Sequence, residues 1–289
     1  MEKKRRCLVL LCVSVLLITA CAGIPSKIEK PQYKLWHYTY TILYDPQQPA
    51  DSPGLDIGLS LTRMMYPAEE INFFNNVLYF GDDPDAYRDG VLRIQRENYR
   101  QKLAVPAEGG PAIPPAGSED EPPEFPEWWS YESSHWLYRE TVTVTNTEYR
   151  GIMAERVINT YSGGAHGFVT KRYYMIDLDS QRLVKIDDIF QDFQGDATRA
   201  VIYDALRNYS GLSAGQPLSE GIYFNDEPEL SFNFFLTPEG LGLHWDPYEI
   251  APYSEGGINL VVPWRNIRPL LLHSGMELLV KFNIHLFVG

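Results

Sequence analysis

Residues 232–263 contain the pattern that most restricts how this chain can fold, because short aromatic runs alternate there with tight turns. An aromatic run at 232–236 is followed by a turn at 237–240 and by a second run, 241–245, in which apolar residues alternate with others. A proline followed two residues later by a glycine is typical of a tight reversal, so the two runs predict a β-hairpin. A further short strand is predicted at 258–262, after a polar glycine turn.

Apolar periodicity in the rest of the chain predicts a second, larger set of strands with helices between them. The runs at 134–146, 152–161 and 168–178 follow one another through short turns and predict an antiparallel meander. Mixed strands and helices with few regular βαβ units predict an α+β fold, with antiparallel sheets packed against a few helices. The other strands are expected at 36–42, 55–65, 183–185 and 277–288, and helices at 71–80, 82–103, 187–209 and 264–272.

The first 21 residues have the features of an export signal. A basic segment at 3–6 precedes an apolar run of 12 residues, which is short of the roughly 20 that span a bilayer. The run ends in Leu-Ile-Thr-Ala-Cys, which resembles a bacterial lipoprotein signal, with cleavage before Cys21 and lipidation of its sulfur. We therefore expect a signal peptide at 1–20, a tether at 21–34, and a protein anchored by lipid on the periplasmic or cell-surface side of a bacterial membrane. An ordinary signal anchor is the alternative.

Cysteine content indicates whether the mature chain can form disulfides, and its net charge indicates which class of partner it favours. Cys7 and Cys12 leave with the signal, so Cys21 remains as the one thiol and no disulfide can form. Without the signal's four basic residues and one acidic residue, 21 basic and 37 acidic side chains remain, a net charge of −16. This charge argues against nucleic acid and favours a cationic protein or peptide. The alternative is that the acidic surface only keeps the protein soluble.

Residues 104–127 form a segment of low complexity, with seven prolines, three glycines and six acidic residues. Such a composition cannot form a packed core, so an exposed, extended insertion is expected. Partner binding and a tolerated surface insertion are both open for this segment.

Two motifs carry a resemblance to a known family. The segment 236–257, LTPEGLGLHWDPYEIAPYSEGG, resembles the signature of the DUF3298 domain, and 161–167, YSGGAHG, resembles the turn of the PdaC-like (DUF4163) module that precedes it. This pair of modules occurs in PdaC-type peptidoglycan deacetylases and in the ectodomains of RsiV-type anti-sigma factors. The resemblance implies a PdaC-like module at 35–178, containing the insertion, and a DUF3298-like module at 179–289, in a lipoprotein variant.

The chain departs from both family types in what accompanies these modules. PdaC-type enzymes continue into a polysaccharide-deacetylase domain, whereas this chain stops at Gly289, so deacetylation is not expected. RsiV-type factors begin with a sigma-binding segment and a transmembrane helix, where this chain has the lipoprotein-like signal. What the resemblance leaves is the shared extracytoplasmic module, which recognises lysozyme in RsiV-type factors.

No motif in the chain predicts a reaction. His166 has no further ligand at metal-binding spacing, and no Gly-x-Ser-x-Gly nucleophile elbow is present. Asp246, Glu249 and Glu255 could approach one another across the hairpin, which leaves paired carboxylates open. We expect a binding protein that is not an enzyme and uses no cofactor or metal.

The expected partner surface combines the two motif segments, because buried tyrosine and tryptophan anchors dominate interface energies. A structural role for the same residues, with prolines and glycines shaping the loop and tyrosines filling a core, is the alternative. A peptidoglycan- or glycan-binding module, with Trp128, Trp129, Trp136 or Trp245 stacking on sugars, and a cell-wall enzyme with an unrecognised site are the competing functions. The predicted partner-binding residues are Tyr161, Gly163, Gly164, His166, Trp245, Tyr248, Glu249, Tyr253 and Glu255.

Overall fold

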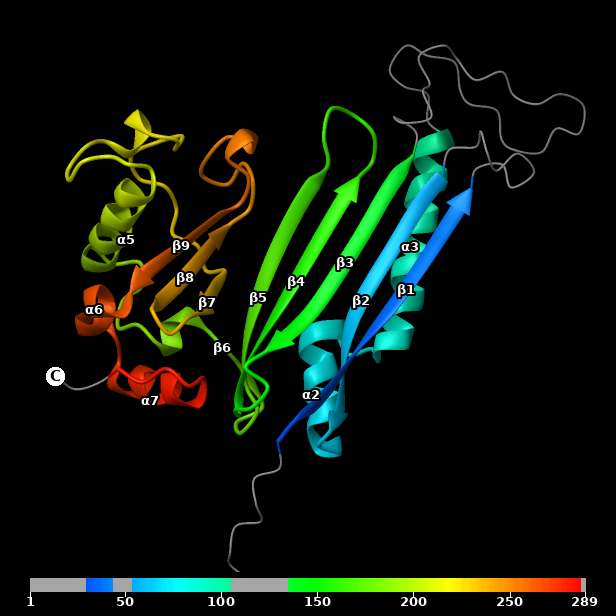
Figure 1. Ribbon diagram of the computed structural model, residues 1–289, viewed down its shortest axis with the longest axis horizontal. Helices are drawn as coiled ribbons and strands as arrows, with labels where there is room; N and C mark the ends of the chain where they lie inside the picture. The colour runs from blue at the N-terminus through cyan, green and yellow to red at the C-terminus, as the bar shows by residue number, and fades with distance from the viewer. Residues whose placement is uncertain (1–29, 44–53, 105–134, 287–289) are drawn as a thin grey trace, which may run out of the picture. The chain divides into compact units, whose positions relative to one another are not determined.

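The computed structural model describes residues 30–43, 54–104 and 135–286, except the side chains of 102–104. The described residues from Pro31 onward belong to one compact unit, which contains a six-stranded sheet and a three-stranded sheet (Figure 1). The strands are β1 (Gln32–Leu43), β2 (Gly54–Tyr66), β3 (Trp136–Thr145), β4 (Gly151–Tyr161), β5 (Phe168–Asp177), β6 (Arg182–Val184), β7 (Phe234–Leu236), β8 (Gly240–Trp245) and β9 (Ile258–Pro263). The helices are α2 (Ala68–Tyr79), α3 (Pro84–Ala104), α5 (Asp196–Tyr209), α6 (Trp264–Ile267) and α7 (His273–Lys281). The predicted α+β class is confirmed.

The six-stranded sheet follows the order of the chain, β1-β2-β3-β4-β5-β6. All of its neighbours are antiparallel except β2 and β3, which run parallel because α2 and α3 form the crossover between them. The predicted meander of β3, β4 and β5 is confirmed. The parallel pair was not foreseen, because periodicity identifies strands without saying which of them pair.

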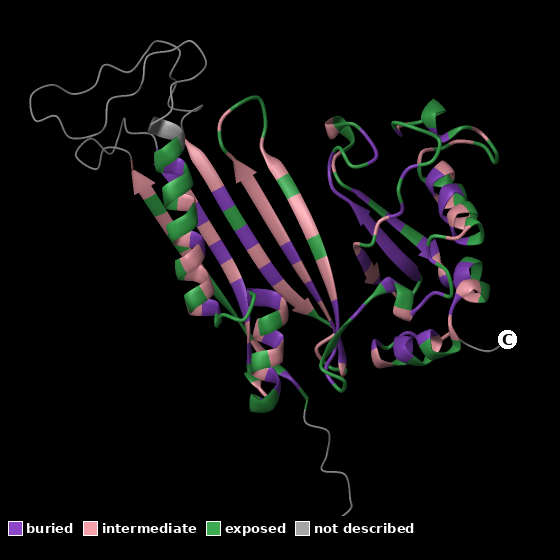
Figure 2. Ribbon diagram, turned by 180° about the vertical axis from the view of Figure 1, so that it is seen from behind, coloured by how far each residue is buried: buried purple, intermediate pink, exposed green. Residues whose placement is uncertain are grey.

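Helices α2 and α3 cover one face of this sheet, and their apolar side chains meet the inward residues of β2 (Figure 2). Strand β2 alternates as predicted, with its apolar residues buried and the residues between them partly exposed. Tyr79 is fully buried and donates its hydroxyl hydrogen to the carbonyl oxygen of Thr62 at 2.5 Å, which fixes the end of α2 to the sheet. The buried apolar residues of β2 are Leu55, Ile57, Leu59, Leu61 and Met64.

The three-stranded sheet has the order β7-β8-β9, and β7 and β8 form the predicted hairpin. Its core is shared with α5, α6 and α7. Every residue of β8 is buried. This is unusual, because Leu241, Leu243 and Trp245 alternate with glycine and histidine, a pattern typical of a strand with one face exposed. Gly240 and Gly242 allow this burial: a Cβ at Gly242 would lie 2.3 Å from the ring of Phe235, so only glycine fits.

The predicted strand at 277–288 is wrong. Residues 273–281 form α7, and the chain turns at Asn283. Leu278, Leu279 and Phe282 are buried on one side of this segment, whereas Val280 is half exposed. A short apolar run fits either a helix or a strand, and packing against the shared core decides between them.

The predicted helix start at Asp187 is also wrong. Asp187 and Asp188 belong to a 3-10 turn, η1 (Ile186–Asp188), and α5 begins only at Asp196 after Gly195. The carboxylate of Asp188 accepts a hydrogen bond from the backbone N–H of Lys185 at 2.8 Å, so it caps the short turn. Acidic residues favour the first turn of a 3-10 helix as well as that of an α-helix, so the two aspartates mark a first turn, but it is the first turn of η1 and not of α5.

An ion pair ties α7 to the six-stranded sheet. Lys281 at the end of α7 lies 2.8 Å from Asp177, which is buried at the end of β5. Asn146, after β3, donates from its amide nitrogen to the carbonyl oxygen of Phe282 at 3.0 Å. These contacts link α7 to the end of β5 and to the turn between β3 and β4.

We expect the Asp177–Lys281 pair to make stability fall with acid. Burial opposes ionisation of Asp177, but hydrogen bonds from Lys281 and Ser180 outweigh it and lower the pKa of the carboxyl below its usual 3.8. A lowered pKa means that the stabilisation is fully present above about pH 5 and is lost as pH falls through the pKa of the folded state. Urea unfolding should show Asp177→Asn to be less stable by about 1–3 kcal/mol at pH 7. The difference from the parent protein should shrink below pH 4; a difference independent of pH would contradict the assignment.

Several predictions concern residues outside the described ranges. These are the signal at 1–20, lipidation of Cys21, most of the insertion at 104–127, and the side chains of Trp128 and Trp129. Of the tether at 21–34, residues 32–34 already belong to β1. Within the described residues, no helix combines the length and the apolar composition needed to cross a bilayer.

Candidate functional site

The outer half of β5 is where the two sheets meet. Strand β6 pairs only with Met175–Asp177, so 168–174 have no strand on that side. Side chains from the smaller sheet supply the missing hydrogen bonds. Asn233 accepts from the backbone N–H of Tyr173 at 2.9 Å and donates to the carbonyl oxygen of Lys171 at 2.7 Å. Asp246 accepts from the backbone N–H of Lys171 at 2.8 Å. The two side chains thus satisfy an exposed strand edge and join the sheets.

Asp246 is the centre of a buried polar network directly after β8. It is 6% exposed and accepts hydrogen bonds from Arg172 at 2.6 Å and from the imidazole of His244 at 2.9 Å. The second ring nitrogen of His244 lies 2.9 Å from the side-chain oxygen of Asn259. Both imidazole nitrogens are therefore engaged, and neither faces a serine or cysteine nucleophile as a catalytic His–Asp pair requires. The network positions the loop that follows β8.

That loop begins with a tight turn that projects Tyr248 into solvent. The backbone N–H of Glu249 donates to the carbonyl oxygen of Asp246 at 3.1 Å, and the carboxylate of Glu249 accepts from the backbone N–H of Asp246 at 2.8 Å. Tyr248 lies at the tip with φ +71° and a 53% exposed side chain. A left-handed conformation is unfavourable for a bulky residue, and such outliers cluster at ligand-contacting sites. Ile250 and Ala251, both buried, anchor the far side of the loop.

The structure brings the two motif segments into contact. The ring of Tyr253 stacks on His166 at a centroid distance of 3.7 Å and an angle of 18°, and its hydroxyl donates to the carbonyl oxygen of Gly167 at 2.6 Å. Tyr248 lies beside Tyr253 at 5.6 Å between ring centroids. We call the three side chains His166, Tyr253 and Tyr248 the aromatic ridge. It is continuous and is exposed at both ends, at His166 and at Tyr248.

Glycines shape the end of the ridge that lies in the β4–β5 turn. Gly163 and Gly164 adopt φ of +86° and +97°, a conformation that favours glycine. The hydroxyl of Tyr161 donates to the carbonyl oxygen of Gly164 at 3.0 Å and closes the turn. Tyr161, Gly163 and Gly164 therefore have a structural role, because they shape the turn. His166 in the same turn is exposed.

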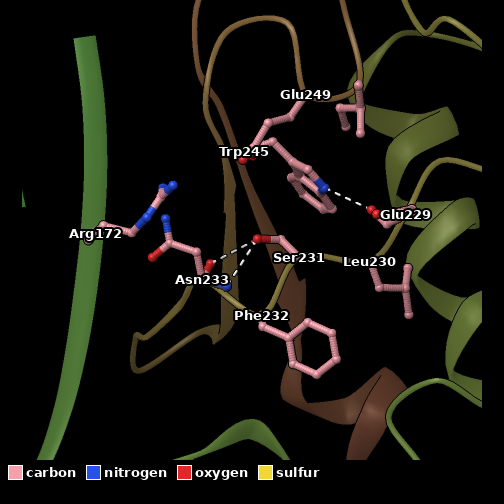
Figure 3. A pocket seen from close by; sticks show the side chains of 9 residues that line it. Arg172, Glu229, Leu230, Ser231, Phe232, Asn233, Trp245 and Glu249 are labelled. Atoms are coloured by element: carbon pink, nitrogen blue, oxygen red, sulfur yellow. Dashed lines mark hydrogen bonds between the residues drawn. The ribbon is translucent and has the colours of Figure 1, made fainter.

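A cleft of about 300 Å³ lies next to the ridge, between β5 and the segment before β7 (Figure 3). Trp245, only 3% exposed, lines it and donates its indole N–H to the carbonyl oxygen of Glu229 at 2.9 Å. Phe232 is 59% exposed at the cleft, and its ring meets Phe193 edge-on. The full lining is Arg172, Glu229, Leu230, Ser231, Phe232, Asn233, Trp245, Glu249 and Ile250.

The predicted partner-binding residues therefore divide into four groups. His166, Tyr248 and Tyr253 form the ridge; Tyr161, Gly163 and Gly164 shape its turn; and Trp245 lies inside, so it cannot act as an exposed anchor. Glu249 and Glu255 are exposed beside the ridge; the carboxylate of Glu249 accepts from the backbone N–H of Asp246, and that of Glu255 accepts from the hydroxyl of Ser254. Among the described residues, no three His, Cys, Asp or Glu side chains are arranged to hold a metal ion.

The residues that hold the site together were not selected from the sequence. The sequence pattern places His244 within a predicted strand and gives no indication that Arg172 or Asn233 has a role in the site. A signal was present: His244 and Asp246 are two residues apart, which places both side chains on the same face of an extended segment. The partners Arg172 and Lys171 are more than 70 residues away, and no local pattern identifies them.

Comparison with known proteins agrees with part of the family resemblance. Residues 187–265 match the model of the family described as "Protein of unknown function (DUF3298)". No curated protein matches the chain. A crystal structure of a DUF3298 family member from Bacteroides fragilis has a TM-score of 0.68 at 16% identity, covering 87% of this chain and 97% of that one. A DUF3298 family protein from Pseudomonas aeruginosa PAO1 has a TM-score of 0.50 at 15% identity, covering 84% and 96%. At these identities the likeness concerns the fold.

Proposed function

We propose that this chain, which carries a DUF3298 domain at 187–265, is a lipid-anchored, non-catalytic binding protein of the bacterial cell envelope that recognises a cationic protein. The observation that carries the proposal is the stacking of Tyr253 on His166, which joins both motif segments into one exposed aromatic ridge. Lysozyme-like hydrolases are the candidate partners, as the resemblance to RsiV-type ectodomains implies.

The chemistry of the ridge supports binding. Tyrosine offers a large, rigid contact area with a hydroxyl at its end, and such side chains are enriched among the residues that dominate interface energies. Tyr253 is held by its bond to Gly167, and Tyr248 by the turn at 246–249, so little conformational freedom is lost when a partner binds. The groups that could carry chemistry, His244 and Asp246, are instead saturated by structural hydrogen bonds.

The charge around the ridge has the sign that a cationic partner needs. Glu249 and Glu255 are exposed on the same loop, and Glu229 is exposed at the cleft. None of these three forms an ion pair within the described part of the chain. A partner lysine or arginine therefore meets carboxylates that have no competing cation, which favours rapid, salt-sensitive association.

We expect Tyr248→Asn to weaken lysozyme binding by at least about 2 kcal/mol, the loss typical of a central interface tyrosine. Asparagine tolerates the left-handed backbone, so the turn should persist. Tyr209→Asn is the matched control, because Tyr209 is 50% exposed on α5, outside the ridge. Titration calorimetry of the full-length protein with lysozyme measures both, and binding of the parent protein should weaken as salt rises.

Purified peptidoglycan is the second ligand in this experiment. Retention of peptidoglycan, insensitive to salt, in place of lysozyme would favour the glycan-binding alternative. Among the tryptophans considered for stacking on sugars, Trp245 is buried, and Trp136 is partly buried with its ring edge-on to Tyr99 at 5.3 Å. Failure of the protein to retain either ligand at any salt concentration would remove the support for both functions. Hydrolysis or deacetylation of cell-wall fragments would show an enzyme.

A further inference from the structure

Helices α2 and α3 lie on one side of the six-stranded sheet (Figure 1). The opposite face has a hollow at Gly58. Residues paired across neighbouring strands point to the same face, so register defines a grid of nine positions on β1, β2 and β3. Gly58 is its centre, and a hollow of about 410 Å³ is lined by all nine positions, so a side chain at Gly58 would project into it. The three rows are Thr41–Asp56–Leu137, Thr39–Gly58–Arg139 and His37–Ser60–Thr141.

The fold does not require glycine at this position. Gly58 lies inside a regular strand without a positive φ, and a Cβ built on it would have one neighbour within 4 Å, the Cγ of Arg139 at an ordinary 3.5 Å. Glycine inside a strand weakens it, since it adds backbone entropy to the unfolded chain and leaves nothing to pack. Gly240 and Gly242 are different, because backbone or ring atoms exclude a Cβ there. What Gly58 provides is space.

Some of the polar groups around the hollow already bond to one another. His37 lies 2.8 Å from the hydroxyl of Ser60, and Thr41 donates to Asp56 at 2.7 Å. The second carboxylate oxygen of Asp56 lies 3.0 Å from His135. These hydrogen bonds involve the two rows on either side of Gly58. The side chains of the middle row, Thr39 and Arg139, take no part in them.

The middle row and its neighbour Thr141 present hydrogen-bond donors without partners. Within the described residues, the guanidinium of Arg139 and the hydroxyls of Thr39 and Thr141 have no hydrogen bond, and Arg139 has no ion pair. Arg139 is exposed, and it is near enough to Asp56 to act on it electrostatically, but both oxygens of that carboxylate are engaged elsewhere. A planar guanidinium beside two hydroxyls offers the donors that an oxyanion accepts from.

We propose that this hollow binds the carboxylate or phosphate of a small, hydroxylated ligand, an acidic sugar, with Arg139 contacting the anion and its ring lying over Gly58. The ring hydroxyls meet Thr39, Thr141 and Ser60, and Leu137 supplies one apolar contact. The hollow has the size of ordinary small-ligand sites. This site is separate from the aromatic ridge and does not depend on the function proposed for it.

The test uses the full-length protein in mild detergent with three probes: glucuronate, glucose 6-phosphate and glucose. Titration calorimetry and saturation-transfer NMR should show saturable binding of one or both anionic sugars at millimolar concentration. The preferred anion identifies the carboxylate or the phosphate as the natural group. Glucose, which lacks the anion, should bind more weakly than either.

Two variants separate binding from folding. Arg139→Gln should weaken anionic-sugar binding about 10- to 100-fold, as expected for a lost charge-assisted hydrogen bond. Arg96→Gln, which removes an exposed guanidinium from α3 on the covered side of the sheet, should leave it unchanged. Gly58→Val should abolish binding while the unfolding temperature stays the same or rises by about 2 °C, because valine suits a strand.

Three results would overturn the proposal. They are the absence of saturable binding of both anionic sugars at tens of millimolar, equal binding by Arg139→Gln and the parent protein, and a clear fall in the unfolding temperature of Gly58→Val. The last would show that glycine is needed by the sheet itself.

Discussion

Replacing Glu140 with alanine should lower the free energy of unfolding by about 3–5 kcal/mol, the cost of leaving a buried charge without its partner. Glu140 on β3 is 1% exposed beneath the helices, and the guanidinium of Arg156 on β4, itself 5% exposed, lies 3.3 Å away. Tyr87 and Tyr138 each donate to the carboxylate at 2.8 Å. Arg156 also donates to the carbonyl oxygen of Leu78. The variant therefore strands a guanidinium and two phenols at once.

A matched control lies on the other face of the same sheet. Glu155 and Lys171 form an ion pair at 3.0 Å whose side chains are about a third and a quarter exposed, so Glu155→Ala should cost no more than about 1 kcal/mol. Urea unfolding followed by tryptophan fluorescence measures both variants. The double variant Glu140→Leu/Arg156→Met should recover much of the loss, since apolar replacement of a whole buried pair is often neutral. Equal effects of Glu140→Ala and Glu155→Ala would contradict this account.

Replacing Asp246 with alanine should cost about 3 kcal/mol and loosen the join between the sheets. The variant leaves buried His244 with one partner fewer, frees Arg172, and removes the acceptor of the Lys171 backbone N–H. Hydrogen exchange at Lys171 should accelerate at least tenfold, because the strand edge there has no other acceptor in the described structure.

Two further variants serve as controls for the effect of Asp246→Ala on stability. Asp246→Asn keeps one acceptor oxygen and should cost less than alanine. Asp204→Ala removes a carboxylate that is 66% exposed on α5 and should change stability little. Unchanged exchange at Lys171 in Asp246→Ala would show that the small sheet does not protect the edge of β5.

Prediction from the sequence worked best where the signal is local. The turn at 237–240 between two aromatic runs predicted the β7–β8 hairpin, and alternation predicted β2 with its buried face. The same local signals marked both motif segments as turns that display aromatic side chains. They did not show that Tyr253 stacks on His166, since 87 positions of chain separate the two residues.

The errors have a common physical origin. The apolar run after Glu277 fits a strand or a helix, and the position of the core selected α7. Trp245 was expected at the partner surface because tryptophan anchors dominate interface energies, but β8 is buried on both faces and its tryptophan is 3% exposed.

By itself, the amino-acid sequence determined the turns, the strand periodicity and the mixed α+β class. These depend on neighbours a few residues apart, where backbone preference and apolar spacing dominate. Only the tertiary structure decided the parallel pairing of β2 and β3, the Asp246 network, the continuity of the aromatic ridge and the hollow at Gly58. Each of these joins segments that are far apart in the chain. Their contacts depend on burial and on strand register, which cannot be read from residues that are neighbours in the sequence.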